Sequence, residues 1–220
     1  MNAVKAILLK ELKIEFRNKQ MINSTLILSL MILASFRFAF SYVDSALTEL
    51  ASPILWVTFF FTAMFSLAPI YKREVDHGTK DGLLLAPISP SSIFFGKLLA
   101  NFVVIMGLNL FSLALFFVFF TYEAPDMAAL LSIVVLGTVG IAVLGNIISA
   151  ISSNLSQSGI MLPVLLIPIL LFSVVMTAVS TTAKIFAGSD IYGILDGIKL
   201  IFIFDIVFLA SGYLLIDYIL

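Results

Sequence analysis

The chain has 220 residues, of which 61% are hydrophobic and 11% are charged, and its formal net charge is −1. A soluble domain carries roughly 25% charged residues, so this composition excludes an ordinary water-soluble protein and predicts an integral membrane domain. The chain contains no cysteine, which excludes disulfides, thiolate catalysis and cysteine-based zinc or haem attachment.

Residues 3–19 have the pattern of an amphipathic helix. Lys10, Lys13 and Arg17 line one face, and most apolar residues fall on the other. This pattern predicts a helix that lies in the membrane interface with its cations toward the headgroups. Glu11 and Glu15 fall within the apolar side. We therefore expect them to pair with Lys or Arg on a neighbouring helix, the alternative being local pairs on a plain surface helix.

Six apolar segments follow, each near the roughly 20 residues that a helix needs to cross a bilayer. They cover residues 22–43, 52–71, 91–121, 127–151, 159–183 and 199–219. Ser89 and Pro90 suit the N-cap and first turn of the third segment. The predicted fold class is thus an all-α membrane protein, with one domain over residues 1–220 that holds six transmembrane helices and the interfacial helix.

Lysine and arginine near the span ends predict the orientation of the chain. Two of them, Lys184 and Lys199, fall on one side of the membrane, whereas nine fall on the other. The nine are Lys5, Lys10, Lys13, Arg17, Lys19, Lys72, Arg73, Lys80 and Lys97. Because positive charge favours the cytoplasm, both termini and the loop at 72–97 are expected there. The outer connections contain Asp44, Glu49, Glu123 and Asp126, and a longer outer segment at 184–197 is expected to be amphipathic, re-entrant or a plain loop.

The loop at 72–97 holds most of the charges outside the N-terminal helix. Within it, GTKDGLLLA reads as a short helix that Pro87 ends. Its three leucines would be exposed unless headgroups or a groove on a partner covered them, and burying one such side chain stabilises by roughly 1.5–3 kcal/mol. A short helix joined rigidly to membrane spans is what a transporter driven by a separate ATPase requires.

Two charged residues fall inside predicted spans. Arg37 and Asp205 each lie about six residues from the outer end of a span, or roughly 9 Å below the outer surface. Ionisable groups at such depth are costly and are usually paired or functional. The hypotheses are that the two residues pair, or that Arg37 meets an anionic substrate; the alternative is that Arg37 snorkels to the interface.

The sequence offers little chemistry of its own. Gly96-Lys97 lacks the earlier glycine and the following Ser or Thr of a phosphate-binding loop, so ATP is expected on a partner chain. His77 is the single histidine and is expected to be a solvated loop residue. No set of convergent catalytic groups is evident, so the chain is predicted to be no enzyme and to bind no cofactor or metal directly.

Several segments resemble the CcmB family, the permease subunits of the ABC exporter for cytochrome c maturation. PILWVTFFF and YKREVDHGTKDGLLLAPISPSSIFFGKLLAN carry the most specific part of the resemblance. LLKELKIEFRNK is similar to the opening helix of that family, and MLPVLLIPILL is similar to its fifth span. One departure is that Asp81 is followed by Gly82, where the family often has an acid directly before the leucine run.

The resemblance implies a function for this chain. It implies an ABC-2-type permease that works with a CcmA-like ATPase subunit and CcmC-like and CcmD-like membrane proteins, and that handles haem or the haem-loaded chaperone CcmE. It also implies a location in the cell inner (plasma) membrane and, because ATPase sites form between two subunits, a homodimer. Six residues stand at the positions of the family's loop motif and become candidates for ATPase coupling: Glu74, Gly78, Asp81, Leu84, Pro87 and Lys97.

Two other functions stay open on the sequence. One is the permease of a different ABC-2-type exporter that moves a drug, a lipid or a polysaccharide. The other is a passive channel or a membrane scaffold without an ATPase. The largest polar loop is predicted to be cytoplasmic, which favours a transporter.

Overall fold

The computed structural model of the chain describes residues 2–40, 44–67, 71–79, 82, 85–120, 126–153, 161–189 and 191–219. Within these ranges the regular structure is helical, and no strand occurs among them. The helices are α1 (Asn2–Arg17), α2 (Lys19–Ala39), α3 (Asp44–Leu67), α4 (Lys72–Asp76), α6 (Pro90–Phe120), α7 (Met127–Ser153), α8 (Met161–Phe186) and α9 (Ile191–Ile219).

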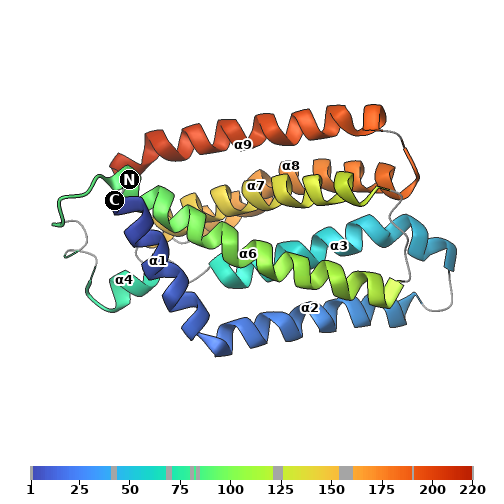
Figure 1. The fold of residues 1–220 in the computed structure, drawn as a ribbon, viewed down its shortest axis with the longest axis horizontal. Helices are drawn as coiled ribbons and strands as arrows, with labels where there is room; N and C mark the ends of the chain where they lie inside the picture. The colour runs from blue at the N-terminus through green and yellow to red at the C-terminus, as the bar shows by residue number, and fades with distance from the viewer. Residues whose placement is uncertain are drawn as a thin grey trace.

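The long helices run side by side along the longest axis of the molecule, and α1 crosses them at one end (Figure 1). Five of them, α2, α3, α6, α7 and α9, are long and apolar enough to cross a membrane. In α8 the side chains are described from residue 173 onward, and this apolar part, Ser173–Phe186, is shorter. The all-helical membrane architecture is thus confirmed, with five of the six expected spans found in the described residues.

One end of the bundle gathers the segments that the sequence places on one side of the membrane. α1, α4, the start of α6 and the C-terminal end of α9 lie there. The opposite end holds the end of α2, the start of α3, the end of α8 and the start of α9 (Figure 1). The helix predicted to be interfacial and the charged loop therefore lie at the same end as both chain termini. Ser89 caps α6 as expected, since its hydroxyl accepts a hydrogen bond from the Ser92 amide at 3.3 Å.

Two predicted boundaries are wrong. Asp44 and Glu49 were expected in an outer connection, but α3 already begins at Asp44. The segment at 184–197 was expected to be separate, but α8 continues to Phe186 and α9 begins at Ile191. The turn between them uses Gly188 at a φ of 77°, a conformation that glycine adopts without steric cost. Both errors arise because a helix can extend past the apolar segment that hydropathy detects.

Polar side chains join the long helices inside the bundle. Trp56 Nε1 donates to the Thr182 hydroxyl at 2.9 Å and links α3 to α8. Asn109 Nδ2 donates to the Thr138 hydroxyl at 3.0 Å, and this contact links α6 to α7. A buried polar group without a partner is costly, and in lipid no water can supply one. Such contacts therefore restrict how neighbouring helices can slide or rotate.

The crossing of α1 over α6 depends on Gly96. A Cβ atom at this position would lie 2.7 Å from both Cβ and Cγ2 of Ile7. Ile7 is itself buried on the inner face of α1. Glycine therefore permits a close approach of the two helices that any larger residue would obstruct.

Replacing Gly96 by leucine should lift α1 from the bundle and destabilise the protein by about 1–3 kcal/mol, the usual cost of overpacking. The thermal unfolding midpoint in detergent and the rate of tryptic cleavage within α1 measure the effect. Gly107 is the matched control, because it lies on the same helix with open space around its Cα. Equal effects of Gly96→Leu and Gly107→Leu would contradict this role of Gly96.

Candidate functional site

The two acids of α1 point into the protein. Glu11 is 6% exposed and Glu15 is 3% exposed, one helical turn apart on the face that carries Ile7. The cations Lys13 and Arg17 are exposed on the outer face. The expectation that the acids pair with bases on neighbouring elements is confirmed, and the partners come from α4 and α6.

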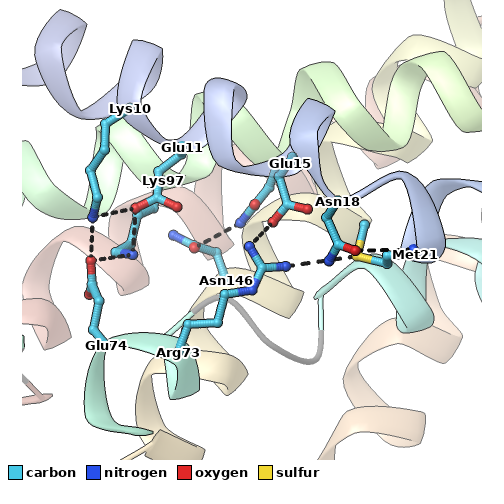
Figure 2. Close-up of polar contacts among 10 residues, drawn as sticks. Lys10, Glu11, Glu15, Asn18, Met21, Arg73, Glu74, Lys97 and Asn146 are labelled. Carbon is cyan, nitrogen blue, oxygen red and sulfur yellow. Dashed lines mark hydrogen bonds and ion pairs between the residues drawn. The ribbon is translucent and has the colours of Figure 1, made fainter. Parts of the chain in front are cut away.

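Four side chains close a ring of alternating charge, here called the charge ring: Lys10, Glu11, Lys97 and Glu74 (Figure 2). Lys10 Nζ lies 3.1 Å from Glu11 Oε1 and 2.7 Å from Glu74 Oε1. Lys97 Nζ lies 2.9 Å from Glu11 Oε1 and 3.1 Å from Glu74 Oε1. Two cations and two anions balance, so the ring joins α1, α4 and α6 without net charge.

A second ion pair lies beside the charge ring. Arg73 Nη1 contacts Glu15 Oε1 at 2.7 Å, and its other terminal nitrogen lies 3.8 Å from the sulfur of Met21 (Figure 2). Arg73 and Glu74 are consecutive residues of α4. The short helix α4 is therefore held at two adjacent positions, by α1 and α6 through Glu74 and by α1 and α2 through Arg73.

Lys97 is the most deeply buried member of the ring, with 0% of its surface exposed. Its Nζ also lies 4.9 Å from the centre of the Tyr71 ring, a cation–π distance. A buried charge is tolerated only when paired and hydrogen-bonded. Lys97 directly follows Gly96, so the close approach of α1 is what brings Glu11 within reach of it.

The ring alters the pKa values of its members on α1. Burial of Glu11 disfavours its charge, but the Lys97 ammonium, with the Lys10 ammonium, outweighs this and lowers the pKa of Glu11 below its ordinary 4.5. Burial also opposes the charge of Lys10, yet the hydrogen bond to Glu74 and the two carboxylates raise the pKa of Lys10 above 10.5. Both shifts favour the charged forms of Glu11 and Lys10.

The structure brings together some of the residues that the sequence singled out. Glu74 and Lys97, at opposite ends of the predicted loop, meet in the charge ring. Gly78, at a φ of 63°, and Pro87 are exposed. Asp81 and Leu84 fall outside the described residues, as do Lys80 and Leu83 of the short helix predicted over GTKDGLLLA.

Arg37 and Asp205 do not lie at equal depth. Arg37 belongs to the last turn of α2, two residues before its end at Ala39, whereas Asp205 is 14 residues from the outer end of α9 at Ile191. At about 1.5 Å per residue these positions are roughly 3 Å and 21 Å from the outer helix ends. Neither carboxyl oxygen of Asp205 has a partner within the described part of the chain, and α2 and α9 lie on opposite edges of the bundle (Figure 1). Pairing within one chain is therefore wrong.

Several residues of the site were not identified as members of it. Lys10, Arg73 and Tyr71 carry no pattern that distinguishes them from other loop or helix residues. The placement of Glu11 and Glu15 on an apolar face did indicate buried pairing, but the partners are 58 to 86 positions away in sequence. Asn146 adds a further contact, since its side-chain oxygen accepts from Asn101 Nδ2 at 3.2 Å.

The described residues include no cluster of three or more His, Cys, Asp or Glu side chains able to hold a metal ion. His77 is exposed at the end of α4. A hollow of about 480 Å³ opens between α2 and α3, lined mainly by apolar side chains such as Met31, Phe36 and Phe61. Its described walls supply neither a histidine nor a charged group.

The fold and the site define a multi-pass helical membrane protein in which a short helix outside the spans is clamped by buried ion pairs to the first helix and to a spanning helix. A family model described as CcmB protein matches residues 2–211. The chain therefore belongs to the CcmB family, and the resemblance found in its sequence is confirmed.

Three curated relatives are each named heme exporter protein B. The chain is 29% identical over 163 residues to the protein of Rhodobacter capsulatus, which covers 74% of each chain. It is 24% identical over 166 residues to that of Pseudomonas aeruginosa, covering 75% of this chain and 74% of the relative. For Paracoccus denitrificans the identity is 26% over 164 residues, covering 74% and 75% respectively.

A double-mutant cycle tests the charge ring. Lys97→Met should destabilise the protein by about 3–5 kcal/mol, because Glu11 and Glu74 then share a buried site without their central cation. Adding Glu11→Gln should recover about 1–3 kcal/mol of this loss, since Lys10 and Glu74 remain as a neutral pair. Unfolding free energies of the four proteins in detergent measure the coupling.

Lys199→Met is the control for that cycle, because the Lys199–Asp196 pair is exposed and 3.8 Å long. It should leave the unfolding free energy unchanged. Strictly additive effects of Lys97→Met and Glu11→Gln would show that the two side chains do not interact.

Acid should loosen α1. The pKa of Glu11 is lowered in the folded protein, so its stabilising contribution is complete above the ordinary value of 4.5 and is lost as pH falls through the lower folded-state value. Thermal unfolding midpoints measured from neutral pH down to pH ~3 should therefore fall. Glu11→Gln should flatten this fall, and an unchanged pH dependence in that variant would refute the assignment.

Proposed function

We propose that this chain is the membrane permease subunit of an ABC transporter for cytochrome c maturation. In this function, ATP hydrolysis by a separate CcmA-like subunit drives haem delivery, through release of the haem-loaded chaperone CcmE. The family match over residues 2–211 and the relatives named heme exporter protein B support this function. The chain itself is a transporter subunit and not an enzyme, with ATP bound by the partner.

One observation supports the coupling part of the proposal: Lys97 Nζ lies 3.1 Å from Glu74 Oε1. They stand near the two ends of the loop at 72–97, so both ends of the loop are fixed to the same buried point. A displacement of the loop is then transmitted to α6, a spanning helix, and through Glu11 to α1. An ATPase that binds the loop, without itself entering the bilayer, needs such a linkage in order to move the membrane helices.

The surface between the two anchored ends is free to contact a partner. Val75, His77 and Pro87 are exposed, and Leu85 is 85% exposed. Large apolar side chains at such exposure outside the spans suit a groove on another protein. We assign this surface, Val75 and His77–Thr79 with Leu85–Pro87, to the ATPase and call it the coupling tip.

The position of the coupling tip relative to the chain termini supports the proposed membrane topology. The coupling tip lies at the end of the bundle where both chain termini lie (Figure 1). The excess of lysine and arginine at this end supports a cytoplasmic location for it. The chain would then sit in the inner (plasma) membrane as a homodimer, one copy for each ATPase subunit, with CcmC-like and CcmD-like proteins beside it.

Substitution of the coupling tip tests the proposal. Leu85→Asp should weaken binding of the ATPase subunit roughly 10- to 100-fold, because a buried leucine contributes about 1.5–3 kcal/mol. Co-purification from detergent and ATP hydrolysis by the assembled complex measure the loss. Tyr192→Asp is the control, since Tyr192 is equally exposed but lies at the opposite end of the bundle.

The charge ring gives the complementary variant. The pair Glu11→Gln with Lys97→Met leaves the coupling tip unaltered, so the ATPase should still bind while haem-dependent maturation of cytochrome c falls. If Leu85→Asp leaves ATPase binding unchanged, the coupling tip is not the contact surface. If no ATPase co-purifies with the unmodified chain, the transporter function itself fails.

A further inference from the structure

Asp205 lies near the middle of a membrane-spanning helix. The apolar segment of α9 runs from Tyr192 to Ile216, and Asp205 is 13 residues from its start and 11 from its end. The residue is only 5% exposed. Its carboxyl group is therefore far from water on both sides of the membrane.

The carboxyl group faces α7 at a point where that helix has no side chain. A Cβ atom at Gly140 would lie 2.7 Å from Asp205 Oδ1 and 2.8 Å from Cγ1 of Val174 on α8. Gly140 thus leaves the space that the carboxyl group fills between three helices. Neither carboxyl oxygen of Asp205 has a hydrogen-bond partner among the described residues.

The described residues of the helices that contact α9 supply no counter-charge to Asp205, since Lys97, the charged residue of α6, pairs with Glu11 and Glu74 in the charge ring. α7 has no charged residue in its sequence, and the described part of α8 has only Lys184, whose Nζ donates to the Gly193 carbonyl at 3.2 Å. On α9 itself, Asp196 and Lys199 pair with each other toward the outer end. Within the described residues, the carboxyl group thus has neither a cation nor a hydrogen-bond partner beside it.

This environment contrasts with the charge ring, where each buried ionised group meets an opposite charge within 3.1 Å. An unpaired carboxylate in an apolar medium costs far more than taking up a proton, so such groups neutralise instead. The protonated, neutral form of the Asp205 side chain therefore suits the space beside Gly140.

We propose that Asp205 is a proton-binding site of the membrane domain, carried as a neutral acid while α9 packs against Gly140. When α9 separates from α7 and water enters, the O–H bond breaks, the proton passes to water and the carboxylate remains. Repacking of the helices takes one proton up again. Movement of α9 is then linked to proton uptake and release.

Infrared spectroscopy of the full chain in lipid vesicles tests the proposal at neutral pH. A protonated carboxylic acid gives a carbonyl stretch that is distinct from the bands of a carboxylate. We expect this band in the unmodified protein and in Asp196→Asn, and its loss in Asp205→Asn. Absence of the band from the unmodified protein, or its persistence in Asp205→Asn, would overturn the assignment.

Stability gives a second, independent measurement. Asparagine has nearly the shape of aspartic acid and is also neutral, so Asp205→Asn should leave the unfolding midpoint unchanged. A carboxylate paired with a cation would behave differently, because its replacement would strand the cation and lower the midpoint by several degrees. Such a fall in Asp205→Asn would count against a neutral acid.

Discussion

The burial of the Lys97 ammonium group constrains the rest of the structure at this end of the bundle. An ammonium group with no exposed surface requires anionic partners, and the chain supplies Glu11 from the first helix and Glu74 from α4. Both acids would repel each other without the cation between them, and Lys10 balances the second negative charge. The position of α1, the position of α4 and the glycine at position 96 follow from this one requirement.

The same arrangement explains how a small extramembranous segment can act on the spans. An exposed surface alone binds a partner but transmits no motion. Here two consecutive residues of α4, Arg73 and Glu74, are tied to α1, and the loop returns to the bundle at Lys97. A push on the coupling tip therefore reaches a spanning helix directly, which is the property that the proposed ATPase coupling needs.

Buried ionisable groups are treated in two ways in this molecule. At the end near α1 they form compensated pairs, and these hold separate elements together. In the middle of α9, Asp205 has no counter-charge and lies against a glycine. The compensated pairs hold α1, α4 and α6 rigidly together. Asp205 makes a helix contact sensitive to protonation, at a place where spans would have to separate in a transport cycle.

Much of the fold could be predicted from the sequence. Hydropathy identified the long helices, the period of α1 identified an amphipathic helix, and the charge distribution grouped α1 with the loop at 72–97, because these properties are local along the chain. The resemblance to the CcmB family was equally visible, since it rests on contiguous motifs. Even the buried pairing of Glu11 and Glu15 was indicated by their place on an apolar face.

The tertiary structure alone decided which groups meet and at what depth. Glu11 and Lys97 are 86 positions apart, and no periodicity relates residues on different helices. Arg37 and Asp205 were assigned equal depth from the predicted apolar runs. Helix ends depend on turns such as that at Gly188, and α9 starts at Ile191, before the run predicted over residues 199–219. Hydropathy, periodicity and charge are local along the chain, so the sequence alone predicts which segments are helical and which of them are apolar. Contacts between helices depend on tertiary packing, which no local sequence pattern contains.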